Sequence, residues 1–173
     1  MELTNTEPTL DIHLPERAVF VTDDNRRARR LRRAAYAVTG ICLLIVAVWV
    51  AGSILLLLPL SYTMTEFEGE VPDTRFYLTI GALATGVTVL FAVTGLALLG
   101  SSPRLSRLRP LLLLLAGIAA AVLAILVGDW TISWNDPGTL LYGLPPAAFI
   151  GLTSLASVAL SLDLVRKRTT MTP

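Results

Sequence analysis

Residues 37–60 read AVTGICLLIVAVWVAGSILLLLPL, a stretch that contains no charged side chain. It belongs to the first of four apolar blocks, which run over about 34–60, 76–100, 110–128 and 142–165. A helix needs about 20 apolar residues to cross a hydrocarbon core about 30 Å thick. A segment in lipid must also satisfy its own backbone hydrogen bonds, so such blocks are helical. The sequence therefore predicts an all-α integral membrane protein with four transmembrane helices in an up-down bundle.

The composition agrees with this prediction. Hydrophobic residues make up 54% of the 173 positions and charged residues only 16%, and the mean hydropathy is +0.67. Soluble domains carry about 25% charged residues and mix them with apolar ones, whereas here the charges lie outside the blocks or at their ends. The composition excludes a soluble globular domain and a disordered chain. The lone cysteine, Cys42, excludes an internally disulfide-bonded scaffold.

Basic residues concentrate at three places in the chain: before the first block, between the second and third, and after the fourth. Segments on the opposite side, 61–75 and 129–138, are acidic, and Arg75 is their one basic residue. Cytoplasmic loops are enriched in Lys and Arg, so we expect a multi-pass protein of the plasma (inner) membrane with both termini cytoplasmic. The residues expected to set topology or bind anionic lipid are Arg26, Arg27, Arg29, Arg30, Arg32, Arg33, Arg104, Arg107, Arg109, Arg166, Lys167 and Arg168.

The charge pattern divides the chain into four regions. These are a polar acidic cytoplasmic tail (1–24), an Arg-rich juxtamembrane segment (25–33), the membrane domain (34–165) and a basic cytoplasmic tail (166–173). Proline suits the first position of a helix, so we expect Pro110 to begin the third helix and Pro145 the regular part of the fourth. The sequence Asp136-Pro137-Gly138 predicts a turn.

Small residues recur at helical spacing within the blocks, and they allow helices to approach closely in lipid. Packing within the bundle is the main expectation, and a stripe on the fourth block that faces another protein is the alternative. Tyr142, Trp130 and Trp134 are expected in the aromatic belt at the outer interface. The predicted packing residues are Gly81, Thr85, Thr88, Ala92, Gly95, Gly117, Ala120, Ala124, Gly151 and Ser154.

The sequence offers little catalytic chemistry. No ionisable residue lies in the interior of a block, although such residues usually mark proton, ion or substrate sites. His13 and Cys42 are too few to form a zinc or iron–sulfur site. No methionine lies in a block to ligate haem, and no phosphate-binding glycine motif is present. We therefore expect no enzymatic activity, no cofactor and no metal, and no nucleic-acid partner.

These observations favour a non-catalytic accessory or structural subunit of a larger bacterial inner-membrane complex. One alternative is a homo-oligomeric channel or facilitator lined by Thr85, Thr88, Ser154 and Ser157. Another is a lipid- or envelope-interacting protein that acts through its outer acidic and aromatic loops. The excess of Arg over Lys, with abundant Ala, Leu, Val and Gly, indicates a GC-rich bacterial genome.

Overall fold

The computed structural model describes residues 17–67, 71, 73–100, 103–134 and 137–169. These residues form four helices: α1 (Arg17–Phe67), α2 (Thr74–Leu99), α3 (Pro103–Trp134) and α4 (Pro137–Thr169). Each contains an 18-residue window with mean hydropathy between 1.8 and 2.9 and is long enough to cross a membrane. The described part of the chain is thus all-helical, and the prediction of four helices of this kind is confirmed.

The helices extend beyond the predicted apolar blocks. The first begins at Arg17, inside the segment expected as a polar tail, and continues to Phe67. Pro110 and Pro145 do not begin helices, which corrects the prediction, because both lie inside α3 and α4. Pro103 and Pro137 take the first helical positions instead. The preference of proline for this position was sound, but it was applied to the wrong prolines. Of the turn expected at 136–138, Pro137 and Gly138 lie in α4, and residue 136 lies outside the described residues.

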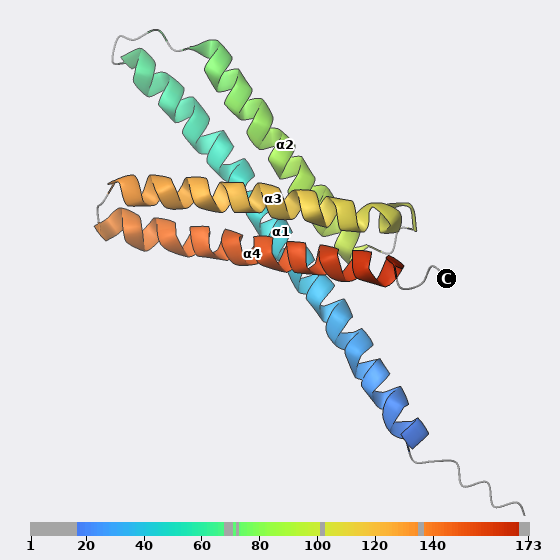
Figure 1. The fold of residues 1–173 in the computed structure, drawn as a ribbon. Coiled ribbons are helices and arrows are strands. Elements are labelled where there is room, and N and C mark those ends of the chain that lie inside the picture. The colour runs from blue at the N-terminus through green and yellow to red at the C-terminus, as the bar shows by residue number, and fades with distance from the viewer. Residues whose placement is uncertain (1–16, 68–70, 72, 101–102, 135–136, 170–173) are drawn as a thin grey trace, which may run out of the picture. The chain divides into compact units, whose positions relative to one another are not determined.

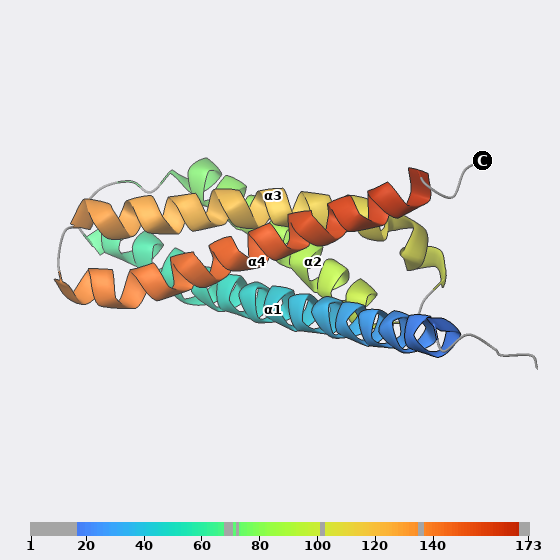
Figure 2. The same ribbon diagram turned by 60° about the horizontal axis from the view of Figure 1, so that its bottom comes forward.

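The chain divides into two compact units, 1–34 and 35–173. In the second unit, α3 and α4 form an antiparallel hairpin and lie side by side (Figures 1 and 2). The α1 and α2 segments form another hairpin, in which Gly40 contacts Gly95 and Tyr62 contacts Tyr77. The α2 helix also packs against α3. The two hairpins cross and separate toward the ends that carry the α1–α2 and α3–α4 connections (Figure 1).

The apolar core lies where the hairpins meet and draws on all four helices. Its largest fully buried side chains include Leu43 of α1, Phe91 of α2, Leu113 of α3 and Ile150 of α4. Few side chains are buried beyond this core, and about a quarter of each apolar window lies inside the fold, between 22% and 28%. Long apolar side chains therefore cover most of the outer surface of the four helices.

Glycine sets the closest approach between α1 and α2. A Cβ atom built on Gly95 would lie 2.8 Å from the carbonyl oxygen of Gly40, and one built on Gly40 would lie 3.0 Å from the carbonyl oxygen of Gly95. Atoms at these separations overlap, so neither position accepts a side chain without a shift of the backbone. Small residues at such crossings are the usual means of packing helices in lipid.

Two serine hydroxyls join α4 to α3. Ser154 Oγ donates to the carbonyl oxygen of Gly117 at 2.7 Å, and Ser161 Oγ donates to that of Pro110 at 2.8 Å. Both serines are buried. Hydrogen bonds between helices contribute about 0.6 kcal/mol each on average in a membrane, so the two bonds stabilise the hairpin. They also determine which residues of α3 and α4 lie opposite each other.

Both ends of α2 are capped. Asp73 accepts hydrogen bonds from the backbone N–H groups of Arg75 and Phe76, at 3.0 and 3.3 Å. At the other end, Arg109 of α3 donates from Nε to the carbonyl oxygen of Ala97 at 3.0 Å and from a terminal nitrogen to that of Gly100 at 2.6 Å. A cation at a helix C-terminus also complements the helix dipole. Arg109 thereby ties the start of α3 to the end of α2.

Candidate functional site

A cavity of the second unit lies between the two hairpins, on the side where they separate. It has a volume of about 940 Å³ and receives side chains from all four helices. Its lining consists of Trp49, Val50, Ser53, Ile54, Leu57 and Leu58 of α1, Ile80 and Ala84 of α2, Leu123, Leu126, Val127 and Trp130 of α3, and Gly138, Tyr142, Gly143 and Pro146 of α4. We call this the inter-hairpin cavity.

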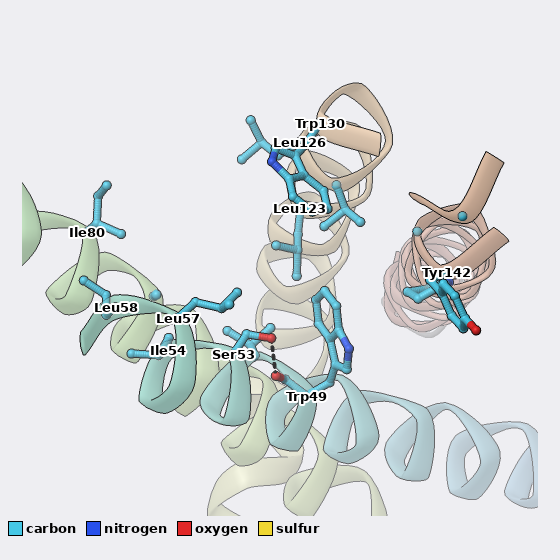
Figure 3. A pocket seen from close by; sticks show the side chains of 16 residues that line it. Trp49, Ser53, Ile54, Leu57, Leu58, Ile80, Leu123, Leu126, Trp130 and Tyr142 are labelled. Carbon is cyan, nitrogen blue, oxygen red and sulfur yellow. Dashed lines mark hydrogen bonds between the residues drawn. The ribbon is translucent and has the colours of Figure 1, made fainter. Parts of the chain in front are cut away.

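Trp49 forms the floor of the inter-hairpin cavity. It points from α1 toward Leu123 of α3, while Leu57 and Ile80 lie on the other side of the space (Figure 3). The hydroxyl of Ser53 turns back to its own helix and donates to the carbonyl oxygen of Trp49 at 2.9 Å. The wall of the cavity is therefore apolar, and its one aliphatic hydroxyl is already hydrogen-bonded.

The inter-hairpin cavity exists because the packing of the hairpins is uneven. The buried core around Leu43, Phe91 and Leu113 lies in the half of the fold where they cross. Beyond this core, at the level of Trp49 to Leu58, α1 still contacts α2, and α3 still contacts α4. Gly81 of α2 remains near Leu58 of α1, with a built Cβ 3.6 Å from Leu58 Cδ1. Gly143 of α4 fits against Thr131 of α3 with no room for a side chain. Each hairpin is closed there, and the space between them is open.

A second surface of interest is the outward face of α2. Ala82 and Gly86 are exposed and four residues apart, and Val89 and Val93 continue the same helical face with exposures of 54% and 39%. Nothing lies within 4 Å of a Cβ built on Gly86. This face, which we call the α2 outer face, has the small-xxx-small spacing of membrane helix contacts, and no other described part of the chain covers it at Gly86.

The first unit, described from Arg17, presents a basic helical surface. Arg26, Arg29, Arg30 and Arg33 follow one another at spacings of three, one and three, so they share one face of α1. All six arginines between 26 and 33 are exposed. Arg166 is exposed near the end of α4, whereas Arg109 is partly buried in its contact with α2. The side chains of Arg104, Arg107, Lys167 and Arg168 lie outside the described residues.

The predicted packing residues have different environments. Gly95, Gly117, Ala120 and Ser154 are buried, and Thr85 is exposed. The others are partly buried: Gly81, Thr88, Ala92, Ala124 and Gly151. A built Cβ on Gly117 would lie 2.7 Å from Val158 Cγ2, so this glycine sets the α3–α4 distance. Gly40, the partner of Gly95, is one of the small residues at helical spacing in the first block, but that spacing did not identify its partner.

The hydroxyls proposed to line a channel are all hydrogen-bonded to backbone carbonyl oxygens in this fold. Thr85 and Thr88 of α2 donate to carbonyl oxygens of their own helix, those of Gly81 and Ala84, at 2.7 and 2.8 Å. Ser157 likewise donates to the carbonyl oxygen of Thr153 at 2.8 Å, and Ser154 is used against α3. None of the four lines the inter-hairpin cavity.

The predicted aromatic belt falls partly on the cavity. Trp130 and Tyr142 line its outer end and are 57% and 80% exposed, and the side chain of Trp134 lies outside the described residues. Trp49, in the middle of the first apolar block, was not predicted as a site residue. Its depth was the available signal, since membrane tryptophans favour the interfaces.

Among the residues that the structure describes, no three His, Cys, Asp or Glu side chains come together to hold a metal ion. Comparisons of the chain with family models, with curated proteins and with solved structures find no match. The candidate sites therefore rest on this chain alone: the inter-hairpin cavity, the α2 outer face and the basic face of α1.

Proposed function

We propose that the chain is a four-span protein of a bacterial plasma membrane and a non-catalytic subunit of a larger membrane complex. Both termini lie in the cytoplasm in this proposal. The four apolar helices support the membrane location, and the basic residues at 26–33 and 166–168 support the orientation by the positive-inside rule.

The observation that carries the subunit proposal is the α2 outer face. Several small residues are used within the chain, as Gly40 and Gly95 are between α1 and α2. Gly86, by contrast, has open space above it and lies four residues from the exposed Ala82. Lipid tails gain nothing from contact with the small side chains of Ala82 and Gly86 rather than with leucine. A partner helix does gain, because it can approach the backbone of α2 closely at this notch. A helix of a larger membrane protein is the partner that fits.

The test is co-purification from the native membrane in mild detergent, with the tagged chain carrying Ala82→Leu or Gly86→Leu. Leucine at either position keeps the helix apolar but fills the notch. We expect the bound partner to fall several-fold relative to the unchanged chain. Ala159→Leu is the matched control, because Ala159 is an exposed alanine on α4. Equal partner recovery with all three substitutions would contradict the proposed docking face.

A role in lipid interaction is the second candidate function, and the inter-hairpin cavity favours it. Ala82 and Gly86 of the α2 outer face do not line the cavity. A ligand in the cavity therefore does not compete with a protein partner on that face. A subunit of a membrane complex can therefore hold a lipid and a protein partner together.

A further inference from the structure

We propose that the inter-hairpin cavity binds the apolar chain of an amphipathic lipid, with the lipid's polar head beside Trp130 and Tyr142. This inference rests on the proposed membrane placement of the helices. A membrane protein does not need an internal lipid site in order to pack its helices. The inference therefore adds a binding site and a ligand class to the proposed placement.

The chemistry of the lining selects an uncharged, apolar ligand. No Asp, Glu, Lys, Arg or His contributes to the wall, and the Ser53 hydroxyl is hydrogen-bonded to the carbonyl oxygen of Trp49. A charged or strongly polar group inserted there would lose its water without gaining a partner, which is costly. Burial of methylene groups against Ile54, Leu123 and Leu126 is favourable instead.

The dimensions fit one leaflet of a bilayer. The lining of α1 runs from Trp49 to Leu58, which is about 14 Å at 1.5 Å per residue. This is close to half of a hydrocarbon core about 30 Å thick. The volume of about 940 Å³ lies within the range of about 300–1,000 Å³ typical of small-molecule sites.

A lipid chain fits the cavity better than a helix of a second copy does. A helix with its side chains is about 10–12 Å wide. The Gly143–Thr131 contact holds the wall between α3 and α4 closed. A flexible chain, which is narrower than a helix, can enter without parting the hairpins.

The cavity is open to the side and polar at one end. Leu57 and Leu126 line it and are both 61% exposed, so it reaches the surface that faces lipid in the proposed placement. Trp130 lies near the end of α3 and Tyr142 near the start of α4, so both line the cavity close to the α3–α4 connection. Amphipathic aromatic rings favour the headgroup level of a bilayer. A lipid that enters sideways therefore has its head at these rings and its chain above Trp49.

The test uses the full-length protein in vesicles of phosphatidylcholine and phosphatidylglycerol that contain a phosphatidylcholine with a diazirine in its acyl chain. After illumination, adducts are mapped by mass spectrometry. Ile54 faces the cavity and the adjacent Leu55 is 75% exposed, so they compare cavity and bulk lipid at one depth. We expect adducts at Ile54 and Leu123 as well as at Leu55.

Two substitutions fill the cavity from different helices, Ala84→Phe on α2 and Val127→Phe on α3. Each is expected to lower adducts at Ile54 and Leu123 several-fold and to leave those at Leu55 unchanged. Ala148→Phe is the matched control, since Ala148 is exposed on α4 and does not line the cavity. Co-elution with the unchanged protein in size-exclusion chromatography establishes that a variant is folded. Because the two substitutions lie on different helices, each tests the cavity independently of the other.

Adducts at Leu55 without adducts at Ile54 and Leu123 would overturn the lipid site and leave the membrane placement intact. Adducts that persist in both filled variants would also overturn it. If the unchanged protein elutes as a dimer and adducts are absent from Ile54 and Leu123, the space belongs to a helix of a second copy. An absence of adducts at all three positions would overturn the lipid site together with the membrane placement, while the co-purification test of the α2 outer face remains separate.

Discussion

The carbonyl oxygen of Gly40 on α1 lies 2.8 Å from the point that a Cβ atom of residue 95 on α2 would occupy. The same position lies 2.8 Å from Leu44 Cγ. A leucine side chain can rotate away, but a backbone carbonyl in a helix cannot. The contact between the two glycines is therefore the fixed point of the α1–α2 hairpin.

Substitution of Gly95 by alanine tests this contact. We expect Gly95→Ala to lower the free energy of unfolding by about 1–3 kcal/mol, the usual range for overpacking. Reversible unfolding by SDS in mixed micelles measures the change. Gly128→Ala is the control, because nothing lies within 4 Å of a Cβ built there. Its stability should be unchanged or higher, since alanine favours the helix by about 1 kcal/mol. Equal effects of the two substitutions would contradict the close crossing.

The serine hydrogen bonds between α4 and α3 give a second prediction. Ser154→Ala removes the donor to the Gly117 carbonyl, and Ser161→Ala the donor to that of Pro110. Each should cost about 0.6–1.7 kcal/mol in the same unfolding measurement. Ser133→Ala is the matched control, because the Ser133 hydroxyl is exposed and donates to the backbone carbonyl oxygen of Asp129 in its own helix. A larger loss from Ser133→Ala than from both buried serines would argue against this registration of the hairpin.

Substitution of Arg109 by lysine separates the effect of the positive charge from that of the paired hydrogen bonds. Arg109→Lys keeps the positive charge, so the orientation in the membrane should not change. It loses the paired donation to the Ala97 and Gly100 carbonyl oxygens, and we expect a loss of about 1 kcal/mol in unfolding free energy. Arg30→Lys, at an exposed position on α1, should leave stability unchanged. If the two lysine variants were equally stable, the cap on α2 would have no energetic role.

Cysteine labelling tests the proposed orientation. With Cys42 replaced by serine, single cysteines are introduced as Thr4→Cys, Glu66→Cys, Ser133→Cys or Thr172→Cys. The clustered arginines favour a cytoplasmic location for both termini. An impermeant thiol reagent applied to intact cells should therefore label residues 66 and 133, and label 4 and 172 only after the membrane is opened. The inverse pattern would show that the orientation is wrong.

The sequence was sufficient for the helices but not for their ends. Continuous apolar runs such as 37–60 predict membrane-type helices with little ambiguity, because length and absence of charge decide the matter. Pro110 and Pro145 misled the prediction of helix starts. A proline inside a helix loses one hydrogen bond, and helices of this kind tolerate it when neighbouring groups compensate. Pro103 and Pro137 were available as starts, but they lie outside the apolar runs that guided the prediction.

The candidate cavity was beyond sequence reasoning. Its existence depends on how far the two hairpins separate above the core around Phe91 and Leu113, and crossing geometry follows from packing between surfaces remote in sequence. Residue type could not separate Ala84, which lines the cavity, from Ala82, which faces outward two positions earlier. The position of Trp49, far from either interface, was the one signal in the sequence.

The most direct test of the subunit proposal is gentle purification of the tagged, unchanged chain from its native membrane, with the stoichiometry of what accompanies it measured by mass spectrometry. The account predicts a larger membrane protein in a fixed ratio to this chain, released when Gly86 is replaced by leucine. Recovery of the chain alone, as a monomer or a homo-oligomer that conducts a solute by itself in liposomes, would contradict the account.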